Sequence, residues 1–265
     1  MNPLYAPSAV PEALATLAVN AAVATVYVFV GYRLARRPVA ARSRLASYQF
    51  SLWWIGLALS LGLNGVEVAL ALLHAFPLAA ALTVYVVSIL VDCAFLWGLV
   101  GSLTYVYTGK YHLLWLGAFY SGFYALVLYW SFSQRPSAVI LAAGSPTLAF
   151  SVPANVGLSL AVVVGLLGPE IAGAILYLSL LRQTKDRTIR YRIRLVGSSI
   201  LLWFALDVFV PSSTSSWALA RDILQVIPGL LSLVALIPPA WVRRRLDLRP
   251  TDRPEEYYRE RPAQP

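Results

Sequence analysis

The chain has 265 residues, of which 59% are hydrophobic and only 12% are charged, and its formal net charge is +9 at pH 7. A soluble domain carries charge on roughly a quarter of its residues, so this composition excludes an ordinary water-soluble domain and favours a helical membrane protein. The single cysteine, Cys93, excludes a disulfide within the chain and a cysteine-based metal site.

Apolar runs of about 20 residues predict seven membrane-spanning helices. The runs are continuous and lack the alternation of barrel strands, so helices are the structure that satisfies the backbone in lipid. We place the spans at 11–35, 47–73, 79–107, 112–132, 152–182, 193–212 and 217–242. The predicted fold class is an all-α seven-transmembrane bundle over residues 11–246, between an outer segment, 1–10, and a polar cytoplasmic tail, 247–265.

Basic residues predict the orientation of this bundle. They concentrate in "RLARRPVAARSR" after the first span, at Lys110 after the third, in "RQTKDRTIRYRIR" after the fifth, and in the tail. Only Arg135 and Arg221 fall on the other side. Because positive loops stay in the cytoplasm, we expect the N-terminus outside and the C-terminus inside a multi-pass protein of the cytoplasmic membrane. This placement indicates attraction to membrane lipids and argues against nucleic-acid binding.

The outer loop "SQRPSAVILAAGSPTLAFSVPAN" predicts a small hairpin over the mouth of the bundle, and a connector that dips into the membrane is the alternative. Its apolar runs, Ala138–Leu141 and Thr147–Phe150, flank the turn-forming "AAGSP". The Pro-rich polar tail is predicted to be mostly disordered beyond Leu246.

Four carboxylates lie within the predicted spans, at Glu67, Asp92, Glu170 and Asp207. A charged side chain at the centre of a membrane helix costs a few kcal/mol, so such residues are candidates for function. Each also has a structural interpretation, as a protonated acid in an interhelical hydrogen bond, a partner of Arg221, or, for Glu170, a neighbour of a helix kink at Pro169.

Span direction places most of these groups in the outer half of the bundle, together with Asn64 and, near Asp207, Trp203. Asn20 and Asn155 fall at a similar depth, and Arg221 and Asp222 lie near the outer end of the seventh span. If these side chains face inward, they form a polar pocket for a small ligand, a cation or a proton. The predicted ligand- or proton-binding residues are Asn64, Glu67, Asp92, Glu170, Trp203 and Asp207.

Several chemistries of seven-helix proteins are excluded by residues that the chain lacks. Retinal needs a lysine in the seventh span, but the only lysines, Lys110 and Lys185, are in predicted loops. A zinc hydrolase needs several histidines, and His74 and His112 fall at opposite membrane faces. No catalytic arrangement is visible, so we predict neither an enzyme nor a cofactor or metal site.

The end of the third span, "LTYVYTGKYHLLW", resembles the segment that closes the third helix in the seven-helix sensor regions preceding bacterial histidine kinases. The stretches "FSLWWIGLALSLGLNGVEVAL" and "RYRIRLVGSSILL" are also similar to that family. The resemblance implies a bundle that senses a ligand or its environment and passes a shift inward. No output domain follows Asp247, so we expect the inner loops or the tail to engage a separate cytoplasmic signalling protein.

Three functions therefore remain open. The preferred one is a non-enzymatic, receptor-like sensor with an outer-half polar pocket, in which Pro169 and Pro228 are flexible points. The second is a proton- or cation-coupled carrier of a small solute that uses Glu170 and Asp92. The third is an accessory subunit of a membrane complex whose buried acids are structural.

Overall fold

The computed structural model describes residues 10–36, 44–73, 77–108, 110, 112–142, 145–151, 168–209 and 215–248. The chain is mostly helical, with one small two-stranded sheet. Its elements are α1 (Val10–Ala35), α2 (Arg44–Leu72), α3 (Leu78–Thr108), α4 (Leu113–Ser133), β1 (Pro136–Ala142), β2 (Ser145–Phe150), α6 (Gly168–Gln183), α7 (Arg187–Phe209), α8 (Ser215–Leu224), α9 (Val226–Leu236) and α10 (Ala240–Leu246).

Four helical segments are long and apolar enough to cross a membrane: Val10–Ala35, Arg44–Leu72, Leu78–Tyr105 and Trp217–Leu236, the last of which includes α9. Large apolar side chains also cover much of the outer surface. On α4, Leu114 is 88% exposed and Trp115 is 81% exposed, an arrangement that water would disfavour and lipid accepts. The chain is thus a membrane protein by the length, composition and surface of its helices.

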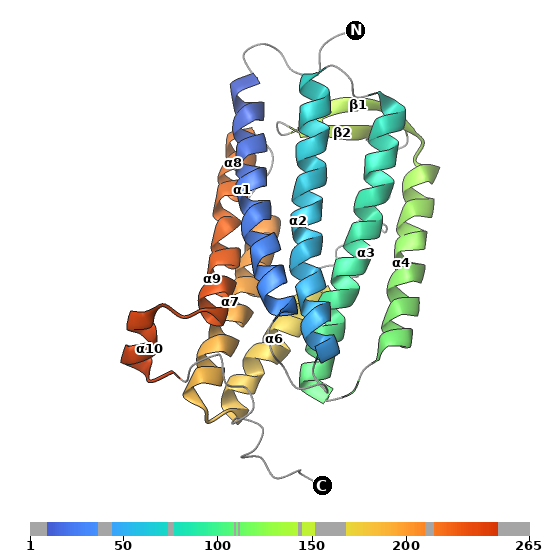
Figure 1. Cartoon of the computed structure of the whole chain (residues 1–265). Coiled ribbons are helices and arrows are strands. Elements are labelled where there is room, and N and C mark those ends of the chain that lie inside the picture. Colours follow the sequence, from blue (N-terminus) through green and yellow to red (C-terminus); the bar gives the residue numbers. More distant parts are fainter. Residues whose placement is uncertain are drawn as a thin grey trace.

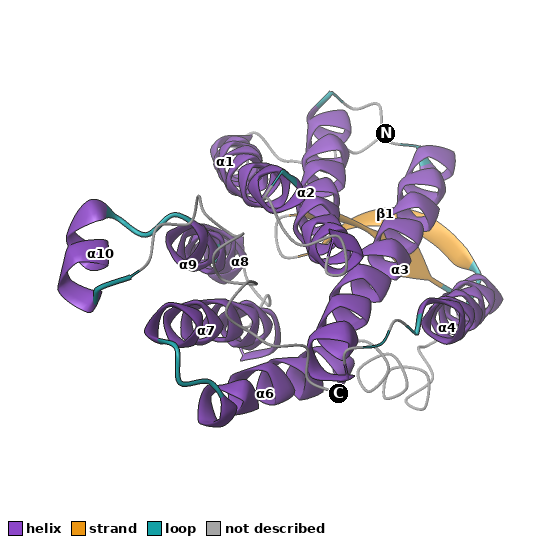
Figure 2. Cartoon of the chain, turned by 60° about the horizontal axis from the view of Figure 1, so that its bottom comes forward, coloured by secondary structure: helices purple, strands orange, loops and turns teal. Residues whose placement is uncertain are grey.

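The helices form a ring in which α1, α2 and α3 are consecutive neighbours (Figures 1 and 2). Helix α3 also contacts α6, α6 packs against α7, and α7 packs against α9. The ring closes where α8 and α9 pack on α1, and α4 lies outside it against α3. Tyr27 of α1 is therefore in contact with Gln225, which lies 198 positions later in the chain.

Aromatic side chains and glycine contacts hold the first three helices together. Trp53 and Trp54 of α2 are fully buried, and the Trp54 ring meets that of Tyr27 of α1 edge-on at 5.0 Å. A Cβ atom added at Gly56 of α2 would collide with Phe95 of α3. The absence of a side chain at Gly56 thus lets α2 and α3 approach closely.

The predicted hairpin is confirmed. Strands β1 and β2 pair antiparallel with Val139 opposite Leu148, and the hairpin packs against the ends of α2 and α3 (Figure 1). These two side chains contact a small apolar cluster that contains Val68 and Ala81. The fold is therefore helical with a small β element rather than strictly all-α.

The predicted spans match the structure to different degrees. Spans 11–35, 47–73, 79–107 and 112–132 correspond to α1–α4 to within about three residues at each end. Helix α7 begins at Arg187, ahead of the predicted 193, because the basic segment continues the helix. Residues 152–167 of the fifth predicted span lie outside the described residues, as does nearly all of the tail.

The seventh predicted span, 217–242, has the wrong end. The helix has a one-residue break at Gln225 between α8 and α9, where the backbone keeps helical dihedral angles and the Gln225 N–H still bonds to the Arg221 carbonyl oxygen, and α9 stops at Leu236. Pro238 and Pro239 follow, and because a proline restricts the residue before it and supplies no N–H, the helix does not continue through them. The short basic helix α10 then lies to the side of the bundle (Figures 1 and 2).

Candidate functional site

A cavity of about 190 Å³ lies where α1, α2, α7 and α8 meet. Most of its lining residues carry polar groups, and the others are aromatic or aliphatic. The lining residues are Asn20, Tyr27, Leu57, Ser60, Leu61, Asn64, Trp203, Arg221, Asp222 and Gln225. A polar, partly aromatic hollow inside an otherwise apolar bundle is the feature expected of a site for a small molecule.

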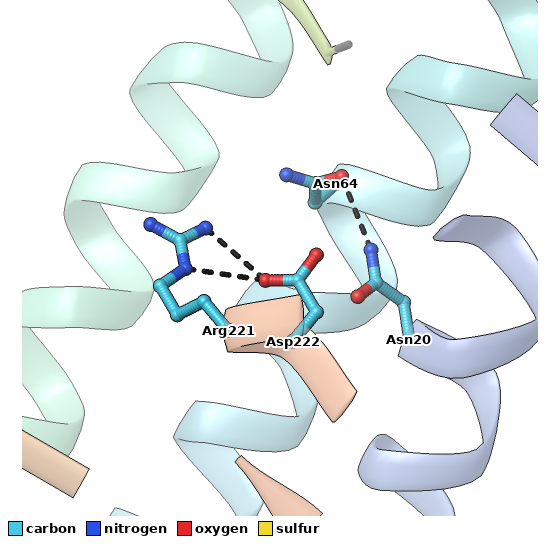
Figure 3. A network of polar contacts seen from close by, with 4 residues as sticks. All are labelled: Asn20, Asn64, Arg221 and Asp222. Carbon is cyan, nitrogen blue, oxygen red and sulfur yellow. Dashed lines mark hydrogen bonds and ion pairs between the residues drawn. The ribbon is translucent and has the colours of Figure 1, made fainter. Parts of the chain in front are cut away.

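An amide pair joins the first two helices at this cavity. The Asn20 side chain of α1 donates from Nδ2 to Oδ1 of Asn64 of α2 at 3.2 Å (Figure 3). Asn20 is 2% exposed, and its own Oδ1 has no hydrogen-bond partner within the described residues. This residue of the cavity lining therefore has a buried acceptor without a donor from the described part of the protein, which is a costly arrangement.

An ion pair on α8 faces the amides from the other side of the cavity (Figure 3). The guanidinium of Arg221 donates to Oδ1 of Asp222 from Nε at 3.3 Å and from Nη2 at 3.1 Å. The side chain of Asp222 is 9% exposed, so the pair sits in surroundings where charge interacts more strongly than in water. Both charges of the cavity lining come from this pair.

The break between α8 and α9 lies at the edge of the same cavity. The buried hydroxyl of Tyr27 donates to the backbone carbonyl oxygen of Gln225 at 2.6 Å. Gly229, one turn further on, packs against the Tyr27 ring, and a Cβ atom there would lie 2.9 Å from the ring carbons. Tyr27 thus ties α1 to the joint of the interrupted helix.

Aromatic rings form one wall of the cavity. Trp203 of α7 lines it, and its ring meets the buried ring of Trp53 edge-on at 6.4 Å. Tyr27, which also lines the cavity, contacts Trp54 in turn. These contacts give the cavity a rigid aromatic boundary continuous with the core of the bundle.

The structure brings some of the predicted site residues to the cavity and leaves others away from it. Asn64 and Trp203 line the cavity. Asp92 lies one step behind it, accepting a hydrogen bond at 3.2 Å from the lining residue Ser60. Glu67 is half-buried on α2 and is not part of the lining. Glu170 is in α6 and Asp207 is in α7, and their side chains lie outside the described residues.

Several lining residues are absent from the predicted set. Asn20, Arg221 and Asp222 attract notice in the sequence as polar residues in apolar segments, but nothing there shows that α1 and α8 are neighbours. Tyr27, Ser60 and Gln225 give no comparable signal, because isolated hydroxyl and amide groups are common in membrane helices. Ring closure by α8 and α9 is what makes them part of one site.

The polar groups of the lining can recognise a small molecule through hydrogen bonds and charge. Within the described residues, no three His, Cys, Asp or Glu side chains are grouped as metal ligands would be. The lining instead offers amide, hydroxyl, guanidinium and carboxylate groups on α1, α2 and α8. A bound molecule would therefore contact several helices at once and favour the arrangement that fits it best.

A comparison with protein-family models gives no match, and a comparison with curated protein sequences gives none either.

Proposed function

We propose that the chain is a non-enzymatic, receptor-like sensor: a seven-helix protein of the cytoplasmic membrane that binds a small molecule in the cavity between α1, α2, α7 and α8. The observation that carries this proposal is that the cavity lies against the helix break at Gln225, so its occupant would contact a segment that leads to the basic helix α10. The N-terminus would be outside and the C-terminus in the cytoplasm, as the basic loops predict.

Hydrogen bonds connect the break to the rest of the bundle. The Tyr27 hydroxyl holds the carbonyl oxygen of Gln225. Beyond it, Ser199 of α7 donates to the carbonyl oxygen of Pro228 at 2.6 Å, and Ser232 donates to Ser199 at 3.0 Å. A shift of α8 would therefore be transmitted to α9 and α7 together, because buried polar contacts exchange partners rather than stretch.

The cytoplasmic end of this route carries charge suited to a partner or to lipid. Arg243, Arg244 and Arg245 of α10 are all exposed. An acidic surface on a separate signalling protein, or anionic lipid headgroups, would complement them. The similarity of "LTYVYTGKYHLLW" to membrane sensor regions supports the same proposal.

The experiment uses the full-length protein with Cys93 replaced by Ser and a fluorescent probe on Arg245→Cys. Small zwitterions, amines, carboxylates and polyols are screened for a rise in Tm, and each stabilising compound is added to protein in nanodiscs. A sensor gives a saturable change in probe fluorescence at the concentrations that stabilise it. Stabilisation without any change at α10, or no stabilisation by any compound, contradicts the proposal.

A carrier is the second candidate, favoured by the interrupted helix beside the cavity. Transporters often bind substrate where a membrane helix is broken, because freed backbone groups and helix ends recognise the solute. Here the break at Gln225 is next to the Arg221–Asp222 pair. Uptake of a stabilising compound into proteoliposomes under a pH gradient would support the carrier, and binding without flux would exclude it.

A further inference from the structure

The hydrogen-bonding groups of the cavity are separated by type (Figure 3). The amide nitrogen of Asn64 points toward the guanidinium of Arg221, so donors gather on one side. The amide oxygen of Asn20 lies on the side of the Asp222 carboxylate, so acceptors gather on the other. A ligand that fills this space needs an acceptor at one end and a donor at the other.

One of the acceptors lacks a hydrogen-bond donor. The Asn20 Oδ1 atom is buried and has no donor within the described residues, although the same amide donates to Asn64. An unpaired buried acceptor costs free energy that a ligand N–H group would recover. A donor group of the ligand placed between Asn20 and Asp222 would satisfy the first and pair with the charge of the second.

The charge of the lining argues for a ligand with no net charge. Arg221 and Asp222 supply one positive and one negative group, and the other lining residues are neutral. A lone ammonium or a lone carboxylate would add an uncompensated charge to a largely buried site, which is unfavourable. A molecule with both groups would place each beside its opposite.

The volume limits the size of that molecule. A cavity of about 190 Å³ has room for about six waters at roughly 30 Å³ each, and hence for a ligand with about that many non-hydrogen atoms. Glycine and alanine have this size. Leu57, Leu61 and the ring of Trp203 supply apolar lining for a methyl group but leave no room for a bulky aromatic side chain.

We propose that the cavity binds a small zwitterionic α-amino acid, with its ammonium between Asn20 and Asp222 and its carboxylate toward Asn64 and Arg221. This inference rests on the proposed function, because it names the molecule that the sensor would detect. It adds a chemical requirement, which is that both charged ends and the N–H donors are needed.

The test is a thermal-shift and calorimetric titration of the full-length protein in detergent. The probes are glycine, L-alanine, glycine betaine, methylammonium, acetate and L-tryptophan. Glycine and L-alanine should raise Tm saturably, whereas betaine, which has no N–H donor, and the singly charged fragments should bind roughly tenfold more weakly or worse. L-Tryptophan should not bind, because it exceeds the cavity.

Substitutions locate the binding. Asp222→Asn and Asn20→Leu should each weaken L-alanine binding roughly tenfold or more, since the first removes the negative charge that pairs with the ammonium and the second removes an acceptor for it. Glu67→Gln is the matched control: it neutralises a carboxyl on α2 outside the lining and should leave binding unchanged. If Asn20→Leu does not fold, Asp222→Asn decides the test, and undiminished L-alanine binding in that variant overturns the placement of the ammonium.

The outcomes separate this inference from the function on which it rests. Betaine, methylammonium or acetate binding as tightly as L-alanine overturns the zwitterion but leaves a sensor of another ligand. Equal loss of binding in Glu67→Gln overturns the placement in the cavity. If none of the probes binds, while another class of compound from the wider screen does, the amino acid is wrong and the sensor stands; if no compound binds, both fail.

Discussion

Asn20 of α1 and Asn64 of α2 share a hydrogen bond of 3.2 Å at the cavity, although they are 44 positions apart in sequence; Asn20 is buried and Asn64 is half-buried. An amide pair of this kind is a specific tie between two membrane helices. It also leaves the Asn20 Oδ1 atom without a partner within the described residues. The hydrogen bond therefore fixes α1 on α2, and the Asn20 Oδ1 atom can accept a hydrogen bond from a ligand.

A double-mutant cycle measures how much the hydrogen bond between Asn20 and Asn64 contributes to the stability of the protein. Asn64→Leu should lower the free energy of unfolding by about 1–3 kcal/mol, because the Asn20 amide is then buried without its acceptor. Asn20→Leu with Asn64→Leu should cost less than the sum of the single changes, since no polar group remains unpaired. Denaturant titration in detergent checks this, and simple additivity would show that the two amides are not coupled.

Substitution of a second buried amide should raise the free energy of unfolding rather than lower it. Gln49 of α2 is 2% exposed, and neither atom of its amide has a hydrogen-bond partner within the described residues. Gln49→Met keeps the approximate volume and removes the unpaired groups, so it should raise the free energy of unfolding by about 1–3 kcal/mol. The same titration measures it. A loss of stability would show that Gln49 makes polar contacts in the membrane-embedded protein.

The close approach of α2 and α3 predicts a contrast between two glycines on one helix. Gly56→Ala should destabilise the protein by about 1–3 kcal/mol, because the added methyl group meets Phe95. Gly62→Ala has nothing within 4 Å of the added atom and should be neutral or slightly stabilising. Thermal unfolding of both variants provides the comparison, and equal effects would contradict the packing of α2 on α3.

The Tyr27 hydroxyl predicts a change in coupling. Tyr27→Phe removes the bond to the Gln225 carbonyl oxygen and should cost about 1 kcal/mol while reducing the ligand-induced signal of the probe at position 245. Tyr85→Phe is the matched control, because it removes a part-buried hydroxyl contact of equal length, to Ser131, away from the cavity. It should cost similar stability and leave the signal intact. Equal signals in the two variants would show that the Tyr27 hydroxyl does not transmit the ligand-induced change to position 245.

The sequence predicts the helices well where continuous apolar runs end at prolines, charges or short polar turns, as they do around α1–α4. It predicts a flexible point at Pro228 but not the break at Gln225, since the segment from Trp217 to Leu236 has the mean hydropathy of one continuous span. Pro228 removes an N–H from the first turn of α9, but a proline at that position is compatible with either a kink or a break.

The site is less predictable, because depth in the membrane does not determine which way a side chain faces. Asn64 and Glu67 are three residues apart, which at 3.6 residues per turn leaves roughly 60° between their directions. Asn64 consequently lines the cavity and Glu67 does not. The contribution of Asp222 depends on α8 packing against α1, a tertiary contact between opposite ends of the chain.

The most direct test of the central claim fills the cavity. Leu61→Trp places a large ring into the lining, whereas Leu59→Trp places the same ring at a position of α2 that is 53% exposed on the outer surface. Both variants are titrated with the compound that stabilises the unmodified protein most, and binding is measured by calorimetry. The account predicts that Leu61→Trp folds and no longer binds, while Leu59→Trp binds as before. Undiminished binding in Leu61→Trp would show that the ligand site lies elsewhere.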